Sequence, residues 1–180
     1  DAFEVVGKMV RQAPDKPLVI SEFGLCEPAF PGGDERRDSL FREKMDVYRK
    51  YPQVAGTINF CLNDYRTQMG EEGEGKLRRR VHGSTDPAGN PKPSYFTVQK
   101  ECAPFQVRWE ENGCRITCRS DLPCYAMHGY QFIMTDGAGV RQKREIDELN
   151  PGEEIFLEMP DIKSLSVYRP NGDFSGNFSK

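Results

Sequence analysis

The stretch Lys16-Pro17-Leu18-Val19-Ile20-Ser21-Glu22-Phe23-Gly24 is the most informative segment of the chain. Its apolar run is bounded by Pro and Gly and is too short for a helix, which is typical of a strand buried on both faces of a parallel sheet. The run ends in the carboxylate of Glu22, and the carboxyl ends of parallel strands are where α/β folds place their reactive groups. The segment therefore predicts a buried strand that presents an acid at a functional edge.

The composition is that of a globular protein. Of the 180 residues, 37% are hydrophobic and 29% are charged, with a formal net charge of −3, and this length allows one domain or two small ones. No apolar run approaches membrane-spanning length and no signal-like segment opens the chain, so we expect no membrane partner. The stretch from Asp1 to Val10 reads as a helix already in progress without a start Met, which predicts that the chain is cut from a longer one.

Residues 1–102 alternate helix and strand. After the first strand, Asp34 can cap a helix from about 35 to 50, and a second buried run from Val54 to Leu62 ends in polar Asn63 and Asp64. A long Gly-rich and charged loop then leads to a helix over 94–102. Strand, helix, strand, loop and helix in this order indicate βαβ connections, and we therefore expect the two strands to pair in parallel.

Residues 103–180 change to the period of a strand. Phe105, Val107 and Trp109 alternate with polar residues, Asn112-Gly113 offers a tight turn, and the alternation resumes at Cys114. If Asn-Gly is a two-residue type I′ loop, Trp109 lies opposite Ile116 and Val107 opposite Cys118, with all four on one face. Further short alternating segments separated by Gly and Pro predict a β-sandwich, with the domain boundary near Ala103-Pro104.

Several motifs occur in an order that resembles a known family. The segment around Glu22 is followed by Asn63-Asp64-Tyr65-Arg66-Thr67, Arg80-Val81-His82-Gly83 and Lys92-Pro93-Ser94-Tyr95. Together they resemble glycoside hydrolase family 2, the β-galactosidase and β-glucuronidase family, over residues 16–102. The resemblance implies the last two strands and helices of a (β/α)8 TIM barrel in residues 1–102, followed by an immunoglobulin-like β-sandwich in 103–180.

The same resemblance implies a retaining β-glycosidase, similar to β-galactosidase, in which Glu22 is the covalent nucleophile. Such an enzyme uses a second carboxyl group as acid and base. In the family that group belongs to an Asn-Glu pair after an earlier barrel strand, which has no counterpart in this sequence. The chain is therefore expected to be part of a longer glycosidase and, by itself, to be inactive because it lacks a complete catalytic pair. No cofactor or metal is implied.

The residues expected to bind the sugar follow the second buried strand. They are Phe60, which stands where the family often carries a Trp, together with Asp64, Arg66 and His82. Phe60 offers an apolar face to a sugar ring but no indole N–H donor. Glu27 is a surface acid or an outer subsite residue. The glucuronidase Asn-x-Lys signature is not evident, which favours a neutral sugar, with galactose first.

Other features have simpler explanations. The six cysteines lack paired Cys-x-x-Cys spacing, so Cys114 and Cys118 are expected to be core positions rather than zinc ligands, and disulfide pairing stays open. The basic run 76–80 follows closely on acidic residues, which is typical of a solvated loop, and no nucleic-acid partner is expected.

The alternative to a glycosidase is a structural or carbohydrate-binding sandwich with a barrel remnant attached. Because two strands cannot close a barrel, residues 1–102 are also expected to be unstable, rearranged or self-associating in isolation.

Overall fold

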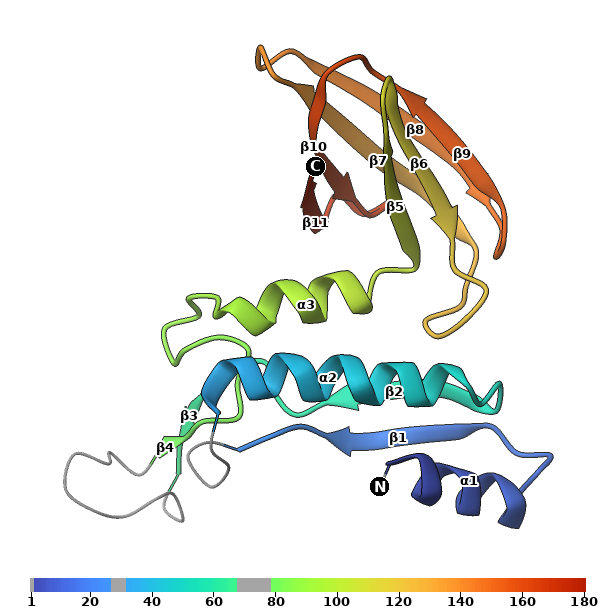
Figure 1. Ribbon diagram of the computed structural model, residues 1–180, viewed down its shortest axis with the longest axis vertical. Helices are drawn as coiled ribbons and strands as arrows, with labels where there is room; N and C mark the ends of the chain where they lie inside the picture. The colour runs from blue at the N-terminus through green and yellow to red at the C-terminus, as the bar shows by residue number, and fades with distance from the viewer. Residues whose placement is uncertain (1, 27–31, 68–78) are drawn as a thin grey trace. The chain divides into compact units, whose positions relative to one another are not determined.

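The computed structural model describes residues 2–26, 32–67 and 79–180 (Figure 1). The chain divides into two compact units, Asp1–Glu101 and Cys102–Lys180. Unit 1 mixes helices with short sheets, whereas unit 2 consists of antiparallel strands. Glu27 and residues 76–78 of the basic run lie outside the described residues.

Unit 1 is built around a parallel pair of strands. Its main elements in chain order are α1 (Ala2–Gln12), β1 (Leu18–Phe23), α2 (Gly33–Arg49), β2 (Val54–Asn59), β3 (Tyr65–Arg66), β4 (Arg79–Arg80) and α3 (Pro93–Glu101). The parallel pairing of β1 with β2 confirms the expected βαβ connection. Two described strands form that sheet, so the partial TIM barrel stays a prediction.

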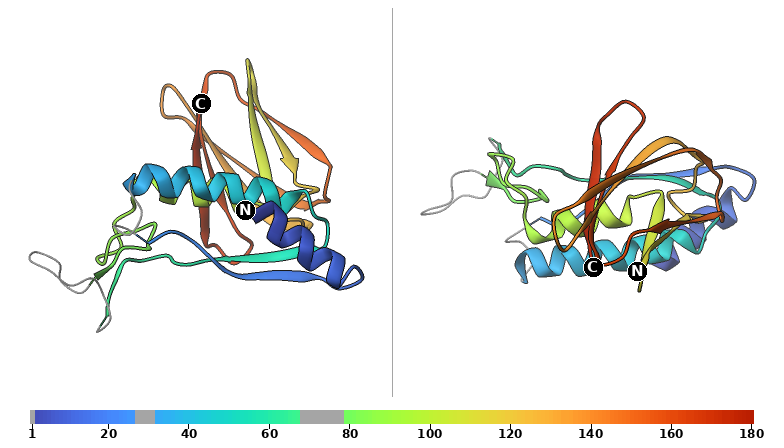
Figure 2. Two further views of the ribbon diagram at one scale, coloured as in Figure 1. Left: turned by 60° about the horizontal axis from the view of Figure 1, so that its bottom comes forward. Right: turned by 90° about the horizontal axis from the view of Figure 1, so that it is seen from above.

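Helices α1 and α2 lie on the same side of the β1–β2 sheet (Figure 2). Phe23 at the end of β1 packs against α2, with ring centroids 5.4 Å from Phe41 and 5.3 Å from Tyr48. Phe41, Met45 and Tyr48 are almost fully buried and form the apolar stripe of this helix. This aromatic packing fixes the end of β1, where Glu22 stands.

Unit 2 consists of two antiparallel sheets. Its strands are β5 (Phe105–Glu110), β6 (Gly113–Cys118), β7 (Met127–Asp136), β8 (Arg141–Leu149), β9 (Glu154–Glu158), β10 (Ile162–Tyr168) and β11 (Phe174–Ser179). They are ordered β5-β6-β9 and β11-β10-β7-β8. Residues from both sheets, among them Ile116, Phe132 and Leu157, form one buried cluster. The antiparallel, strand-rich architecture agrees with the expected all-β region, while its immunoglobulin-like assignment stays a prediction.

The first hairpin of unit 2 corrects the expected register. Trp109 lies opposite Cys114 and Val107 opposite Ile116, and Glu110 pairs with Gly113, so the loop is Glu111-Asn112 and not Asn112-Gly113. Gly113 is the first residue of β6, next to β9. Glycine is required there because a Cβ would lie 2.2 Å from the carbonyl oxygen of Leu157 on β9. The shift is two residues, and since side chains alternate with period two, the apolar residues keep their common face.

Candidate active site

Glu22 lies next to a close approach of two backbone segments. The amide of Phe60, just past β2, donates a hydrogen bond of 2.8 Å to the carbonyl of Phe23. A Cβ at Gly24 would lie 2.0 Å from the carbonyl oxygen of Phe60, so this position requires Gly. Phe23 and Gly24 therefore bring the ends of the two strands together, next to the exposed carboxylate of Glu22.

Phe60 belongs to a small aromatic cluster. Its ring meets His82 edge to face at 5.4 Å and Tyr65 edge to face at 6.1 Å, while Tyr65 and His82 stack at 6.0 Å with an interplanar angle of 12°. All three side chains are half-buried, so each has a solvent-facing part. The peptide bond between Phe60 and Cys61 is cis. Sequence reasoning placed Phe60 and His82 in the site but gave no role to Tyr65, although Tyr65 stands in one of its motifs.

His82 is electrostatically linked to Glu22. Burial lowers the pKa of His82, and the nearby charges of Arg80 and Arg37 lower it further, whereas Glu22 and Asp64 act in the opposite direction. The net effect is a pKa below the usual value, which keeps the imidazole uncharged at neutral pH. A neutral imidazole donates one hydrogen bond and accepts another, which suits an uncharged hydroxyl group.

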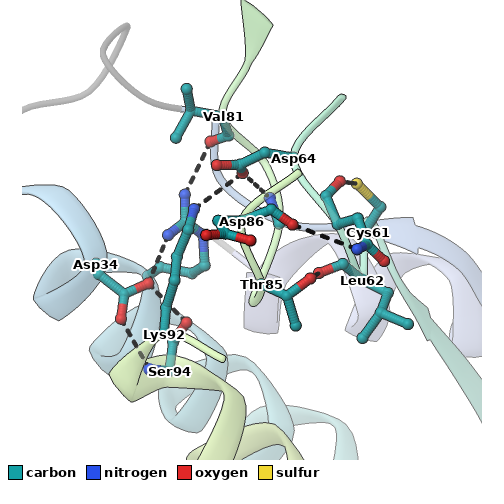
Figure 3. Close-up of polar contacts among 12 residues, drawn as sticks. Asp34, Cys61, Leu62, Asp64, Val81, Thr85, Asp86, Lys92 and Ser94 are labelled. Atoms are coloured by element: carbon teal, nitrogen blue, oxygen red, sulfur yellow. Dashed lines mark hydrogen bonds and ion pairs between the residues drawn. The ribbon is translucent and has the colours of Figure 1, made fainter. Parts of the chain in front are cut away.

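Asp64 is not on the surface of the site. It is 4% exposed, and its Oδ1 accepts hydrogen bonds from the Gly83 amide at 2.8 Å and from Lys92 Nζ at 2.9 Å (Figure 3). A Cβ at Gly83 would lie 2.1 Å from the Asp64 amide nitrogen, so the two segments touch through their backbones. The structure thus places Asp64 beneath the segment that carries His82.

Arg66 lies further out. It is exposed on the two-residue strand β3, where it pairs with Arg79 of β4, while Tyr65 pairs with Arg80. Arg66 therefore shares a short ladder with the aromatic cluster. Its predicted contact with substrate stays a prediction.

Glu22 also borders an open pocket of about 410 Å³. The pocket lies among α1, β1 and α2, with Val5, Met9 and Lys44 in its wall. Phe60 and His82 are not part of that wall. Glu22 accordingly lines this pocket, and its charge also acts on the imidazole of His82.

Two of the six cysteines are packing residues of a core. Cys114 and Cys118 are fully buried in the core of unit 2, which confirms the structural reading of both. Beside the candidate site, burial and then the charge of Asp64 raise the pKa of Cys61, so its thiol stays protonated at neutral pH. Within the described ranges, no group of three or more His, Cys, Asp or Glu side chains could hold a metal ion. None of the described helices is long and apolar enough to cross a bilayer.

Comparison with solved structures gives distant likenesses, while no protein-family model and no curated protein matches the chain. Among solved structures it is similar to the crystal structure of an FMN-binding beta-glucuronidase from Facaelibacterium prausnitzii L2-6, at 13% identity and a TM-score of 0.46. The match covers 92% of this chain but 27% of that one, so the chain spans about a quarter of that protein's length. A likeness at this level establishes neither a shared activity nor membership of glycoside hydrolase family 2.

Proposed function

We propose that this chain carries the nucleophile side of the active site of a retaining β-glycosidase, with Glu22 as the nucleophile. The observation that carries the proposal is the position of Glu22: an exposed carboxylate at the end of a parallel strand, whose charge reaches the imidazole of His82. His82 in turn contacts Phe60 edge to face and stacks on Tyr65, so aromatic rings adjoin the imidazole on which the Glu22 charge acts. A sugar subsite of a retaining glycosidase requires a carboxylate, an aromatic ring and a neutral hydrogen-bonding group.

In this proposal the Glu22 carboxylate attacks the anomeric carbon, forms a glycosyl ester and releases the leaving group as its alkoxide or, once protonated, its alcohol. Water then attacks the anomeric carbon and gives its proton to a base, so that the bond to Glu22 breaks, the sugar leaves and the carboxylate is restored. A second carboxyl group about 5–5.5 Å away performs both proton transfers in such enzymes. Asp64 is buried against Lys92 and is unsuited to that role. We therefore propose that the acid/base residue comes from outside this chain.

We propose an uncharged sugar because the glucuronidase Asn-x-Lys signature is not evident in the sequence. The neutral imidazole of His82 suits one of the hydroxyl groups of such a sugar. Phe60 and His82 are proposed to contact the sugar ring and one of its hydroxyl groups. Galactose is the first sugar to test, with glucuronide as the comparison.

The test is hydrolysis of 2,4-dinitrophenyl β-glycosides by the 180-residue chain. Dinitrophenolate leaves without help from a general acid, so the assay isolates the nucleophile from the missing acid/base residue. We expect slow turnover of the galactoside, lost in Glu22→Gln and kept in Glu43→Gln, which removes an exposed carboxylate from α2. In parallel, a 2-fluoro-galactoside with the same leaving group should label Glu22, as located by peptide mass spectrometry.

Two results would overturn the proposal. One is turnover that survives Glu22→Gln. The other is a chain that neither turns over nor is labelled by any sugar of the panel.

The alternative of a carbohydrate-binding unit 2 receives less support. Trp109, the only Trp of the chain, is half-buried and packs against the unit 2 core, and it is not a free aromatic platform. Galactose that quenches or shifts Trp109 fluorescence at millimolar concentration would favour that alternative.

A further inference from the structure

The segment that carries His82 is held on both of its sides by buried charged residues. On one side, Arg37 of α2 donates from Nη2 to the carbonyl of Val81 at 2.8 Å. On the other, the amide of Gly83 donates to Asp64 at 2.8 Å. The two peptide groups that flank His82 in the sequence are therefore each fixed by a charged partner, and hydrogen bonds to charged groups are the stronger class.

Arg37 is itself held in place by α3. Its Nη1 donates to Asp34 Oδ1 at 2.6 Å, and the same carboxylate accepts from the Ser94 amide at 2.8 Å and the Ser94 hydroxyl at 2.6 Å (Figure 3). Burial alone would raise the pKa of Asp34, but the hydrogen bonds from Ser94 and the contact with Arg37 outweigh it and lower that pKa. Asp34 thus stays ionised and fixes the guanidinium, which is 5% exposed.

Asp64 has a corresponding support in Lys92, which stands just before α3. The Asp64 side chain is 2% exposed and the Lys92 side chain is 18% exposed. Both partners of the His82 segment are therefore anchored to the same region of the fold, the start of α3. Leaving the buried charge of Arg37 or Asp64 without its partner would cost free energy. These paired charges therefore favour one geometry of the His82 segment.

We propose that Arg37 and Asp64 are positioning residues that fix His82 at the edge of the candidate sugar site. They act on the sugar only through His82, because both lie beneath the segment that carries it. The part that concerns a sugar rests on the proposed function, whereas the fixing of His82 can be tested without any ligand.

The charged groups that face His82 come from three elements and one loop. Arg37 lies on α2, Arg80 on β4, Glu22 on β1, and Asp64 follows β2. Removing the Arg37 charge and loosening the segment both raise the pKa of His82, because less positive charge and less burial each favour the imidazolium. Removing Asp64 gives opposing effects. Arg37 is therefore the residue to change.

The experiment is NMR of the imidazole groups in the full 180-residue chain. The chain has two histidines, and His128, exposed in unit 2, serves as an internal reference. In the unchanged protein we expect cross-peaks between the His82 and Tyr65 rings and a pKa below that of a free histidine. In Arg37→Met we expect the cross-peaks to disappear and the pKa of His82 to rise, with His128 unmoved.

Two further variants separate position from charge and from general loss of structure. Arg37→Lys keeps the charge but cannot bridge Asp34 and Val81 in the same geometry, so the cross-peaks should weaken while the pKa rises less. Arg42→Met is the matched control. Arg42 also lies on α2 and donates to Thr97 of α3 at 3.0 Å, and it has no described contact with the His82 segment. It should leave both readouts unchanged.

The results distinguish this proposal from the proposed function. If Arg37→Met leaves the His82 cross-peaks and pKa as they were, or if Arg42→Met changes them equally, the positioning role is wrong, even where galactosides are hydrolysed. The role is also wrong if His82 shows no contact with Tyr65 in the unchanged chain. If His82 responds as expected, the role stands even where no galactoside is hydrolysed. Where galactosides are hydrolysed, Arg37→Met should lower turnover by about tenfold, as expected for one weakened hydrogen bond.

Discussion

The two units of this chain are stabilised in different ways. Unit 2 closes on itself: its central strands bury Phe132, Leu165 and Val167 completely, and residues from both sheets share one core. Among the described residues, unit 1 leaves more large apolar side chains exposed than unit 2 does, including Val5 and Met9 of α1, Val19 of β1 and Ile58 of β2. An apolar surface of this kind is typical of a contact region, and self-association of unit 1 stays a prediction.

The distribution of buried polar groups shows the opposite asymmetry. Among the described residues, the buried polar or charged side chains lie in unit 1, with the exception of Arg119. They are Arg37, Asp64, Ser84, Thr85, Ser94 and Thr97. Unit 1 therefore relies on directional polar contacts, which hold its surface residues in one geometry, while unit 2 relies on apolar burial, which is not directional. Fixed polar groups are what a binding site needs, so unit 1 is the expected place for the site.

The largest effect is expected from breaking the core of unit 2. Phe132 is 0% exposed and meets Phe105 edge to face at 5.9 Å, so Phe132→Ala should lower the free energy of unfolding of unit 2 by about 3–5 kcal/mol. Trp109 lies in unit 2, and its fluorescence during urea unfolding reports that unit alone.

The matched control is Phe174→Ala, which removes a ring that is 53% exposed and should cost about 1 kcal/mol or less. Equal losses from the two variants would contradict the picture of a single closed core in unit 2.

A smaller effect is expected from the polar contacts of unit 1. Lys92→Met leaves the buried Asp64 carboxylate without its ammonium partner and should destabilise unit 1 by about 2–3 kcal/mol. The comparison variant in unit 2 is Lys163→Met. Its ion pair with Asp161 is exposed at both ends, 57% and 65%, so the loss should stay below about 1 kcal/mol.

Unfolding of unit 1 can be followed through the NMR signal of His82, and that of unit 2 through Trp109. A Lys92 variant as stable as the parent would show that unit 1 does not depend on its buried charges.

The sequence predicts elements well where the pattern is local. The helices of unit 1 and the parallel pairing of β1 with β2 follow from apolar spacing and from connection length. The hairpin register was missed because the close approach of Gly113 to Leu157 involves a strand more than forty residues away, and turn chemistry alone favoured another loop.

The candidate site was harder to predict than the elements that carry it. Arg37 reads as a solvated residue on a charged helix, yet its partner Val81 stands 44 residues later. Asp64 was expected to contact substrate because it ends a buried strand, and nothing local signals that Lys92, 28 residues on, lies against it. Long-range polar contacts leave no periodic signal in a sequence. Glu22 was singled out by its place at the end of a buried strand and by the resemblance of its segment to a known family, whereas the residues that hold His82 carry no such signal.

The smallest effect concerns alkaline pH and sharpens the account of unit 2. Burial raises the pKa of the Cys114 thiol from 9.0 to about 11. A raised pKa means that the folded state keeps a proton that the unfolded chain loses, so stability is complete below pH 9 and declines as pH rises toward 11. At pH 10 this single group should cost unit 2 about 1.4 kcal/mol.

Cys114→Val keeps a small apolar side chain in place and should remove that part of the pH dependence, whereas Cys124→Ala, at an exposed position, should keep it. Urea unfolding followed by Trp109 at pH 8 and pH 10 compares the three proteins. An equally steep alkaline loss in Cys114→Val would mean that other groups dominate, of which Tyr130 is the first to examine, because burial and its contact with Tyr125 raise its pKa as well.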